Sequence, residues 1–391
     1  MHIFFSVGEP SGDQHAAHLF HELKRRHPDI RGTGYGGPLM REAGCDLQFQ
    51  LTDCAVVGFL AVLPMIFTFI RLVREAGRLL KETKPDAVVL VDFPGFNWFI
   101  ARKAKKAGIP VYYYMPPQLW AWASWRVRRM RKFVDHVLCG LPFEVDWYAK
   151  RGVRAEYVGH PFFDEVADYH LDNDFCRKIA ESEQTTLGIL PGSRNSEIER
   201  NWPTLLEVMA ETHRRYPDVK FAVASYREKQ RARCAEMLTA SGLDLPIEFF
   251  VGKTPEIIQS TKFCVMVSGS VSLEMLARKQ AALVIYCVGK MFYSFVRPLS
   301  NIDSMTLPNL ILGKTLYPEW VLAFGREPKK REIIEMVDCW LRDRIALEAK
   351  KREVARLADS LVETGATARA ADYLMKTLRP RVEAAGHRQA A

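Results

Sequence analysis

Short apolar runs that alternate with helical stretches, twice over, constrain the fold of this chain more than any other feature. In the first 160 residues we expect strands at 3–7, 87–91, 111–114 and 134–139, and helices at 13–26 and 101–107. After a polar stretch the alternation restarts, with expected strands at 187–190, 221–224, 263–267 and 282–286 and helices at 202–215 and 272–277. Short apolar strands separated by helices indicate parallel sheets that are covered on both faces.

The sequence therefore predicts an α/β protein with two doubly wound, Rossmann-like domains that face a cleft. The expected divisions of the 391 residues are a first domain at 1–165, a linker at 166–185, a second domain at 186–345, charged helices at 346–378 and a frayed tail at 379–391. In such sheets ligands bind at the carboxyl ends of the strands.

The net charge of +9 is concentrated in one stretch. Residues 93–134 contain no Asp or Glu, and they hold nine cations: Arg102, Lys103, Lys105, Lys106, Arg126, Arg128, Arg129, Arg131 and Lys132. Tryptophans lie among these cations, and we select Trp120, Trp122 and Arg126 as candidate acceptor- or membrane-binding residues. The pattern suits a nucleic acid, a phosphate-bearing substrate or phospholipid headgroups, and a solvated basic face explains the charge alone equally well.

An uncharged segment at 54–70 precedes a row of four cations, Arg71, Arg74, Arg78 and Lys81. The segment is shorter than the roughly 20 residues that a membrane-spanning helix needs, and it contains Gly58 and Pro64. An apolar surface beside cations favours an interfacial membrane anchor, with Phe67 and Phe69 in it, over a buried core helix.

The eight cysteines are scattered without any C-x-x-C pair, and the N-terminus has no basic leader. This usage is typical of a reduced, cytoplasmic protein, and we expect no disulfide framework and no signal peptide. We also expect no metal, because Asp172 and Asp174 fall in the polar linker and His15, His18 and His21 fit a solvated helix face.

Two turns in the first half place carboxylates directly after strands. Residues 8–13 (GEPSGD) carry Glu9 and Asp13, and residues 92–97 (DFPGFN) begin with Asp92. Burial after an apolar strand raises the pKa of a carboxyl toward that of a useful base. The alternative is that Ser11, Asp13 or Asp92 caps the helix that follows.

Two turns in the second half resemble anion-binding sites. Gly192, Ser193 and Arg194 lie between an expected strand and helix, where backbone N–H groups and a guanidinium would meet a phosphate. Ser268, Gly269 and Ser270 repeat the arrangement, and Glu274 on the next helix would hold ribose hydroxyls. Together the turns suggest a nucleotide diphosphate, although each alone is more often a helix cap.

These strings together resemble the lipid-A-disaccharide synthase family of bacterial glycosyltransferases. The matching strings occur in the family's order over almost the whole chain: GEPSGD (8–13), DFPGFN (92–97), PPQLWAW (116–122), LPFE (141–144), GHP (159–161), LPGSR with a following Glu (190–197), SGSVSLE (268–274) and LPN (307–309). The resemblance implies a two-domain fold of the GT-B type, with a C-terminal helix that crosses back to the first domain.

The resemblance also implies a reaction. Diacylglucosamine would pass from UDP-2,3-diacylglucosamine to 2,3-diacylglucosamine 1-phosphate (lipid X), with inversion to a β-1,6 linkage and without a metal or other cofactor. It implies a cytoplasmic enzyme at the inner face of the cytoplasmic membrane, with no nucleic-acid partner, and it leaves a homodimer open.

The resemblance extends to individual residues. Arg194, Ser268, Ser270, Glu274 and Asn309 match family positions near the nucleotide. Many members carry Asp, the usual candidate base, where this chain has Gly95. We therefore assign the base to Asp92, with Glu9 and Asp13 as reserves. The rivals are another GT-B enzyme acting on a UDP-sugar, either an epimerase or a transferase with a soluble acceptor, and a non-catalytic basic adaptor for membranes or nucleic acid.

Overall fold

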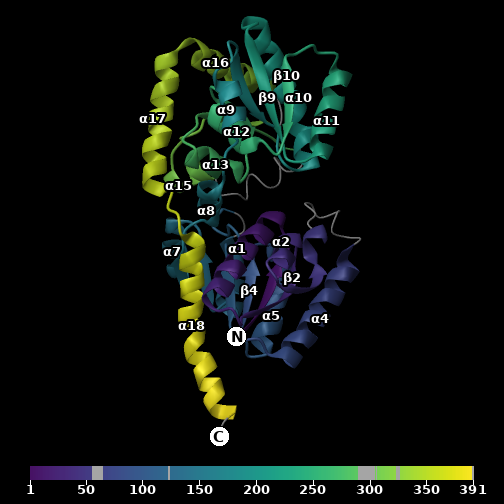
Figure 1. Ribbon diagram of the computed structural model, residues 1–391, viewed down its shortest axis with the longest axis vertical. Coiled ribbons are helices and arrows are strands. Elements are labelled where there is room, and N and C mark those ends of the chain that lie inside the picture. Colours follow the sequence, from purple (N-terminus) through teal and green to yellow (C-terminus); the bar gives the residue numbers. More distant parts are fainter. Residues whose placement is uncertain (55–64, 122–123, 289–303, 305, 323–325, 390–391) are drawn as a thin grey trace. The chain divides into compact units, whose positions relative to one another are not determined.

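The chain folds into two α/β units, each built on a parallel sheet (Figure 1). The computed structural model describes residues 1–391 except 55–64, 122–123, 289–303, 305, 323–325 and 390–391, and it describes only the backbone of 326–328 and 379–389. Unit 1 comprises Met1–Asp164 and Glu363–Ala391, and unit 2 comprises Glu165–Val362. The fold class predicted from the alternating pattern, two doubly wound parallel-sheet domains, is confirmed.

Unit 1 contains a seven-stranded sheet in the order β3-β2-β1-β4-β5-β6-β7. Its strands are β1 (His2–Val7), β2 (Arg31–Gly36), β3 (Asp46–Gln50), β4 (Ala87–Val91), β5 (Val111–Tyr114), β6 (His136–Cys139) and β7 (Ala155–Tyr157). Its helices are α1 (Pro10–Arg26), α2 (Pro38–Glu42), η1 (Leu51–Cys54), α4 (Ile66–Thr83), α5 (Pro94–Lys106), η3 (Ser124–Arg126), α6 (Val127–Phe133), α7 (Pro142–Ala149) and α18 (Ala366–Gln389), with α8 (Pro161–Asp168) at its boundary.

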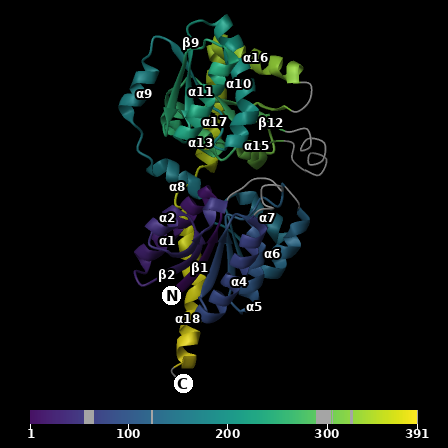
Figure 2. The same ribbon diagram turned by 90° about the vertical axis from the view of Figure 1, so that its right-hand side faces the viewer.

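Both faces of this sheet are covered, as its fully apolar central strand β4 requires. Val88 and Leu90 on β4 pack toward α4, α5 and α6, and the alternate residues Ala87, Val89 and Val91 pack toward α1 and α18. Figure 2 shows α1, α2 and α18 on one side of this unit and α4, α5 and α6 on the other.

Unit 2 contains a six-stranded sheet in the order β10-β9-β8-β11-β12-β13. Its strands are β8 (Thr185–Leu190), β9 (Val219–Ser225), β10 (Ile247–Val251), β11 (Cys264–Val267), β12 (Ala282–Cys287) and β13 (Glu319–Leu322). Its helices are α9 (Asn173–Ala180), α10 (Asn195–Arg215), α11 (Glu228–Ser241), α12 (Thr254–Ser260), α13 (Val271–Ala277), α15 (Leu307–Leu312), α16 (Arg326–Arg342) and α17 (Arg344–Leu361). Trp202 and Leu205 on α10 pack on one face of the sheet, and Ile257 on α12 and Met275 on α13 pack on the other.

The structure revises several predicted boundaries. The expected linker at 166–185 contains α9, whose Phe175 ring contacts Phe250 with 4.9 Å between ring centroids. The C-terminal helices divide between the units, since α17 belongs to unit 2 and only α18 returns to pack on α1 in unit 1. Helix α18 continues to Gln389, so the predicted end of helical structure at 378 is wrong.

The expected anchor segment at 54–70 is described only in part, because 55–64 lie outside the described residues. Among the helices that the structure does describe, none is both long and apolar enough to span a bilayer.

Candidate functional site

In unit 1 the strand order reverses between β1 and β4, and in open α/β sheets ligands bind outside the carboxyl ends of the strands at such a switch point. The loops that follow these two strands touch each other there. A Cβ atom on Gly8 would lie 2.2 Å from Cδ1 of Phe93, so only a glycine leaves room for the Phe93 ring. The predicted turns at 8–13 and 92–97 thus meet at the switch point of the sheet.

Asp92 occupies a strained backbone position at this switch point. Its φ is 43° and that of Phe93 is 46°, a left-handed region that costs non-glycine residues about 1–3 kcal/mol each. The Asp92 carbonyl accepts hydrogen bonds from Tyr113 Oη at 2.6 Å and from Asn97 Nδ2 at 2.8 Å, and these two donors hold the strained conformation. The half-buried Asp92 therefore has a fixed place at the carboxyl end of β4.

Asn97 connects the two central strands, β1 and β4. The sequence analysis named it only as part of the DFPGFN motif. Its side chain is fully buried, accepts from Ser6 Oγ at 2.6 Å and donates to the carbonyls of Ser6 and Val91 at 3.1 and 3.2 Å. A signal was available, because Asn97 is a polar residue between the apolar Phe96 and Trp98 on a helix.

Asp13, predicted as a reserve base, has a structural role. Its buried carboxylate accepts from three backbone N–H groups, those of Gly37 at 2.7 Å, Leu39 at 3.0 Å and Met40 at 3.3 Å. These are the orphan donors at the start of α2, whose N-cap Gly37 offers no side chain. Burial raises the pKa of Asp13, and the three amides oppose that rise. The predicted capping of the helix that directly follows is wrong, because α1 has no side-chain cap and Asp13 caps α2 instead.

We expect Asp13→Ala to lower the free energy of unfolding by about 2–4 kcal/mol, because it strands three amides that are buried or half-buried. Chemical denaturation measures this loss. Asp53→Ala is a control, since that carboxylate is exposed and, within the described part of the chain, accepts from the Gln50 side chain alone. An equal effect of the two substitutions would contradict the capping role.

Glu9, the other reserve, is the N-cap residue of α1, where its carbonyl accepts from Asp13 N at 2.9 Å. Its side chain makes no capping hydrogen bond to the helix. The structure thus brings Glu9 and Asp92 to the same end of neighbouring strands, β1 and β4, and engages Asp13 elsewhere.

Trp120 and Arg126 lie on the connection between β5 and α6, and Trp122 lies outside the described residues. Trp120 is half-buried and donates its indole N–H to Glu144 Oε1 at 2.9 Å. The Arg126 guanidinium lies 5.3 Å from the Trp125 ring centre, and its Nε is buried without a hydrogen-bond partner. Trp125 itself is 61% exposed.

Two titratable residues near this connection, the buried Glu144 and the half-buried His160, were not among the predicted site residues. Burial raises the pKa of Glu144 to about 7, which the hydrogen bonds from Trp120 and Leu141 N oppose. Burial, with a smaller effect of His15, lowers the pKa of His160 to about 3, so this imidazole is neutral. His160 Nδ1 accepts from Phe162 N at 3.3 Å. Both residues fall in short strings, LPFE and GHP, that follow strands β6 and β7.

The two predicted membrane residues on α4, Phe67 and Phe69, face different surroundings. Phe67 is 80% exposed, with Ile66 and Ile70 exposed beside it. Phe69 packs into the core instead, 6.1 Å from Phe93 and 5.6 Å from Phe96 between ring centroids. An apolar patch is thus present on α4, and the prediction that Phe69 belongs to its exposed surface is wrong.

In unit 2 the strand order reverses between β8 and β11, and the two predicted anion-binding turns follow these strands. The backbone N–H groups of Ser193 and Arg194 donate to Glu197 Oε2 at 3.1 and 3.2 Å, and Arg194 Nη1 donates to Glu197 Oε1 at 2.9 Å. Gly192 has φ 106°, and a Cβ there would lie 2.8 Å from Glu197 Oε2. The amides that the sequence analysis assigned to phosphate are therefore engaged by Glu197, while the Arg194 side chain remains 55% exposed.

The second turn presents Gly269 and Ser270 to solvent, with open space beside Gly269 Cα. Ser272 Oγ donates to the Gly269 carbonyl at 2.8 Å, which fixes the turn at the start of α13, and Ser268 is half-buried. Glu274 is buried and pairs with Arg278 Nε at 2.9 Å. Burial raises the pKa of Glu274, and Arg278 opposes the rise.

Asn309, predicted near the nucleotide, holds a neighbouring loop in place. It is 1% exposed, its Oδ1 accepts from the amides of Leu316 and Tyr317 at 2.8 and 2.9 Å, and its Nδ2 donates to the Tyr317 carbonyl at 2.8 Å. These bonds indicate a structural role.

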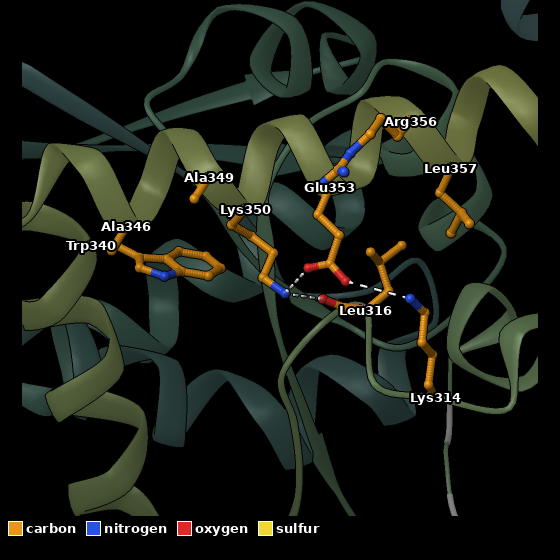
Figure 3. A pocket seen from close by; sticks show the side chains of 9 residues that line it. All are labelled: Lys314, Leu316, Trp340, Ala346, Ala349, Lys350, Glu353, Arg356 and Leu357. Carbon is orange, nitrogen blue, oxygen red and sulfur yellow. Dashed lines mark hydrogen bonds and ion pairs between the residues drawn. The ribbon is translucent and has the colours of Figure 1, made fainter.

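A hollow of about 520 Å³ lies between α17 and this loop (Figure 3). Three of its four charged side chains pair with one another, since Glu353 contacts Lys350 Nζ at 2.7 Å and Lys314 Nζ at 3.8 Å. The predicted site residues are absent from its lining. Elsewhere in the described ranges, no group of three His, Cys, Asp or Glu side chains has a metal-binding arrangement.

Known structures share this architecture. UDP-GlcNAc 2-epimerase from Neisseria meningitidis bound to UDP-GlcNAc superposes with a TM-score of 0.67 at 12% identity, covering 96% of this chain and 100% of that one. MurG of Acinetobacter baumannii superposes with a TM-score of 0.59 at 14% identity, covering 96% and 99%. The fold is the GT-B fold of glycosyltransferases and epimerases.

Sequence relatives are more specific. The family model described as lipid-A-disaccharide synthetase matches residues 3–359. Lipid-A-disaccharide synthase of Anaeromyxobacter dehalogenans (strain 2CP-C) is 33% identical over 377 residues, 96% of this chain and 97% of the relative. That of Idiomarina loihiensis is 35% identical over 335 residues, 85% of this chain and 88% of the relative. The chain therefore belongs to the lipid-A-disaccharide synthase family and is a glycosyltransferase of lipid A biosynthesis.

Proposed function

We propose that this glycosyltransferase moves diacylglucosamine from UDP-2,3-diacylglucosamine to the 6-hydroxyl of 2,3-diacylglucosamine 1-phosphate, with inversion at the donor's anomeric carbon. The observation that carries the mechanism is Asp92, a carboxylate fixed in a left-handed backbone position at the switch point of unit 1. An inverting transfer needs one general base for the acceptor hydroxyl, and a half-buried carboxylate at a strand end suits that role. No metal or other cofactor enters the proposed reaction.

In unit 2 the proposed donor site comprises the turns after β8 and β11. Arg194 is the exposed cation that would face the diphosphate, with Gly192, Ser193, Ser268, Gly269 and Ser270 forming the two turns. Glu274, held by Arg278, would accept from the ribose hydroxyls. Asn309 would act through the 316–317 backbone.

An assay of UDP release tests this function directly. Purified protein should release UDP only when UDP-2,3-diacylglucosamine and diacylglucosamine 1-phosphate are both present. Replacing the acceptor with unacylated glucosamine 1-phosphate should abolish release, and UDP-GlcNAc should be a poor donor. Epimerisation of UDP-GlcNAc in the absence of an acceptor would favour the epimerase alternative. UDP release with the unacylated acceptor would favour a transferase with a soluble acceptor.

We further propose that unit 1 binds the inner face of the cytoplasmic membrane through α4 and the cations of α5 and α6. Ile66, Phe67 and Ile70 form an apolar patch on α4, and the cations Arg71, Arg74, Arg78 and Lys81 on the same helix are exposed. Arg71 and Arg78 lie 4.0 and 3.8 Å from Glu75 and Glu82, so part of this charge is compensated. Apolar insertion beside cations is the pattern of interfacial helices.

We expect Phe67→Ser with Ile70→Ser to move the protein from the membrane fraction to the soluble fraction, because the exposed apolar area that inserts is lost. High salt should also weaken membrane binding, because it screens the cations. Sedimentation with anionic vesicles measures both effects. Tyr226→Ser, which removes a 54% exposed aromatic residue from unit 2, is the control. Unchanged sedimentation of the double variant would place the anchor elsewhere.

A further inference from the structure

Glu144 divides its two carboxylate oxygens between two different parts of unit 1. Oε2 accepts from the backbone N–H of Leu141 at 3.2 Å, which caps α7. Oε1 accepts from the indole N–H of Trp120 at 2.9 Å. Capping of α7 requires only the first of these bonds. The second bond reaches a different segment, the connection between β5 and α6.

Among its described residues, this connection is anchored by Leu119, which lies in the core, and by contacts with α7. It leaves β5 through Met115, whose φ is 49°. Tyr148 Oη on α7 donates to the Pro117 carbonyl at 3.4 Å, and the Trp120 ring meets Phe143 edge to face at 4.9 Å. The Trp120–Glu144 bond is the shortest of these contacts with α7. The connection then leads into Arg126, where the proposed acceptor site has a cation.

We propose that Glu144 is a positioning residue for the acceptor: by accepting the Trp120 indole N–H it fixes residues 116–121 against α7. This inference rests on the proposed function, because the ligand that the loop would serve is the phosphorylated acceptor sugar. Glu144 itself is 3% exposed, so it acts through Trp120 and does not touch the substrate.

Among the titratable groups in this part of unit 1, Glu144 is the one whose charge changes near pH 7. Cys139 on β6 and Tyr148 on α7 face it, and burial raises the pKa of both, so they are neutral near pH 7. Tyr113 on β5 is neutral for the same reason. With a pKa of about 7, Glu144 gains its charge between pH 6 and 8. An indole N–H binds a carboxylate more strongly than a neutral carboxyl group, so the loop should be held more firmly as the pH rises.

A double-mutant cycle with Glu144→Gln and Trp120→Phe tests the contact. Each substitution should raise the acceptor KM by roughly tenfold and leave kcat and the donor KM within about twofold. The double variant should be no worse than Trp120→Phe alone, because Glu144→Gln only weakens a bond whose donor Trp120→Phe removes. Trp147→Phe, which removes an indole from the same helix as Glu144, should combine with Glu144→Gln independently.

The pH profile adds a readout that a purely structural role would not move. The acceptor KM of the unaltered enzyme should fall from pH 6 to 8 more steeply than that of the Glu144→Gln variant. The acceptor phosphate titrates in the same way in the assays of both enzymes, so it does not cause the expected difference between the two pH profiles. Identical profiles, multiplicative effects in the cycle or a lowered melting temperature with an unchanged acceptor KM would each overturn the proposal. A lack of acceptor-dependent UDP release by the unaltered enzyme would instead refute the proposed function.

Discussion

Replacing Asp92 with Asn is expected to lower turnover by about 10²–10⁴-fold, with donor binding nearly intact. Asn keeps the shape of the side chain and removes its basicity. It is also, after glycine, among the residues that best tolerate the left-handed backbone that position 92 adopts at φ 43°. The carbonyl bonds from Tyr113 and Asn97 involve only the backbone of residue 92, so they survive the substitution. Single-turnover rates and donor affinity, measured on the same preparation, separate chemistry from binding.

A second substitution tests where the base must sit. Gly95 lies in the first turn of α5, and a Cβ added there meets nothing within 4 Å, so Asp fits at the position where many family members carry it. Gly95→Asp in the Asp92→Asn background should restore part of the lost turnover. Near-normal turnover of Asp92→Asn, with loss in Glu9→Gln, would transfer the role to the loop after β1.

The central strands of both sheets were predictable because each contains a short, mostly apolar run. The prediction for β4, at 87–91, matches the structure at both ends, and that for β1 at 3–7 differs by one residue. Helix starts were placed too late, since α10 begins at Asn195 and not at 202. Its first turns are polar, and apolar periodicity cannot detect a turn that is held by the Glu197 carboxylate.

The outer strands were missed for a physical reason. Strand β2 reads RGTGYG, which by composition is a turn. Gly34 has φ 132°, and a Cβ there would lie 2.0 Å from the Phe5 carbonyl oxygen on β1, so the glycine permits close strand pairing. At the edges, β10 and β13 have few buried side chains and lack the apolar signal.

The candidate site was predictable as a set of turns and less so as a set of side-chain roles. Strand ends placed Glu9, Asp92, Arg194 and Ser268 at the two switch points correctly, because parallel topology alone determines that edge. The partners of Asp13 and Asn309, and the Trp120 partner of Glu144, lie 7 to 27 positions away in the sequence, and no local pattern specifies them. Buried polar residues are therefore the part of the site that required the three-dimensional structure.

Arg194→Ala should reduce kcat/KM for the donor by about 2–4 kcal/mol, because negative charge on the leaving diphosphate grows in the transition state. Both kcat and donor affinity should fall. The substitution leaves the turn in place, since Glu197 Oε2 accepts from the backbone amides of residues 193 and 194 whatever side chain residue 194 carries. The loss therefore reports the guanidinium and not a collapsed turn.

Arg233→Ala is the matched control for this prediction. Arg233 lies in the same unit and pairs with Glu199 of α10 at 2.5 Å, as Arg194 pairs with Glu197 of the same helix at 2.9 Å. Exposed ion pairs of this kind contribute about 0–1 kcal/mol to stability. Arg233→Ala should therefore leave steady-state kinetics unchanged. If Arg194→Ala behaves in the same way, Arg194 is only a partner of Glu197, and the charge that meets the diphosphate must come from another side chain.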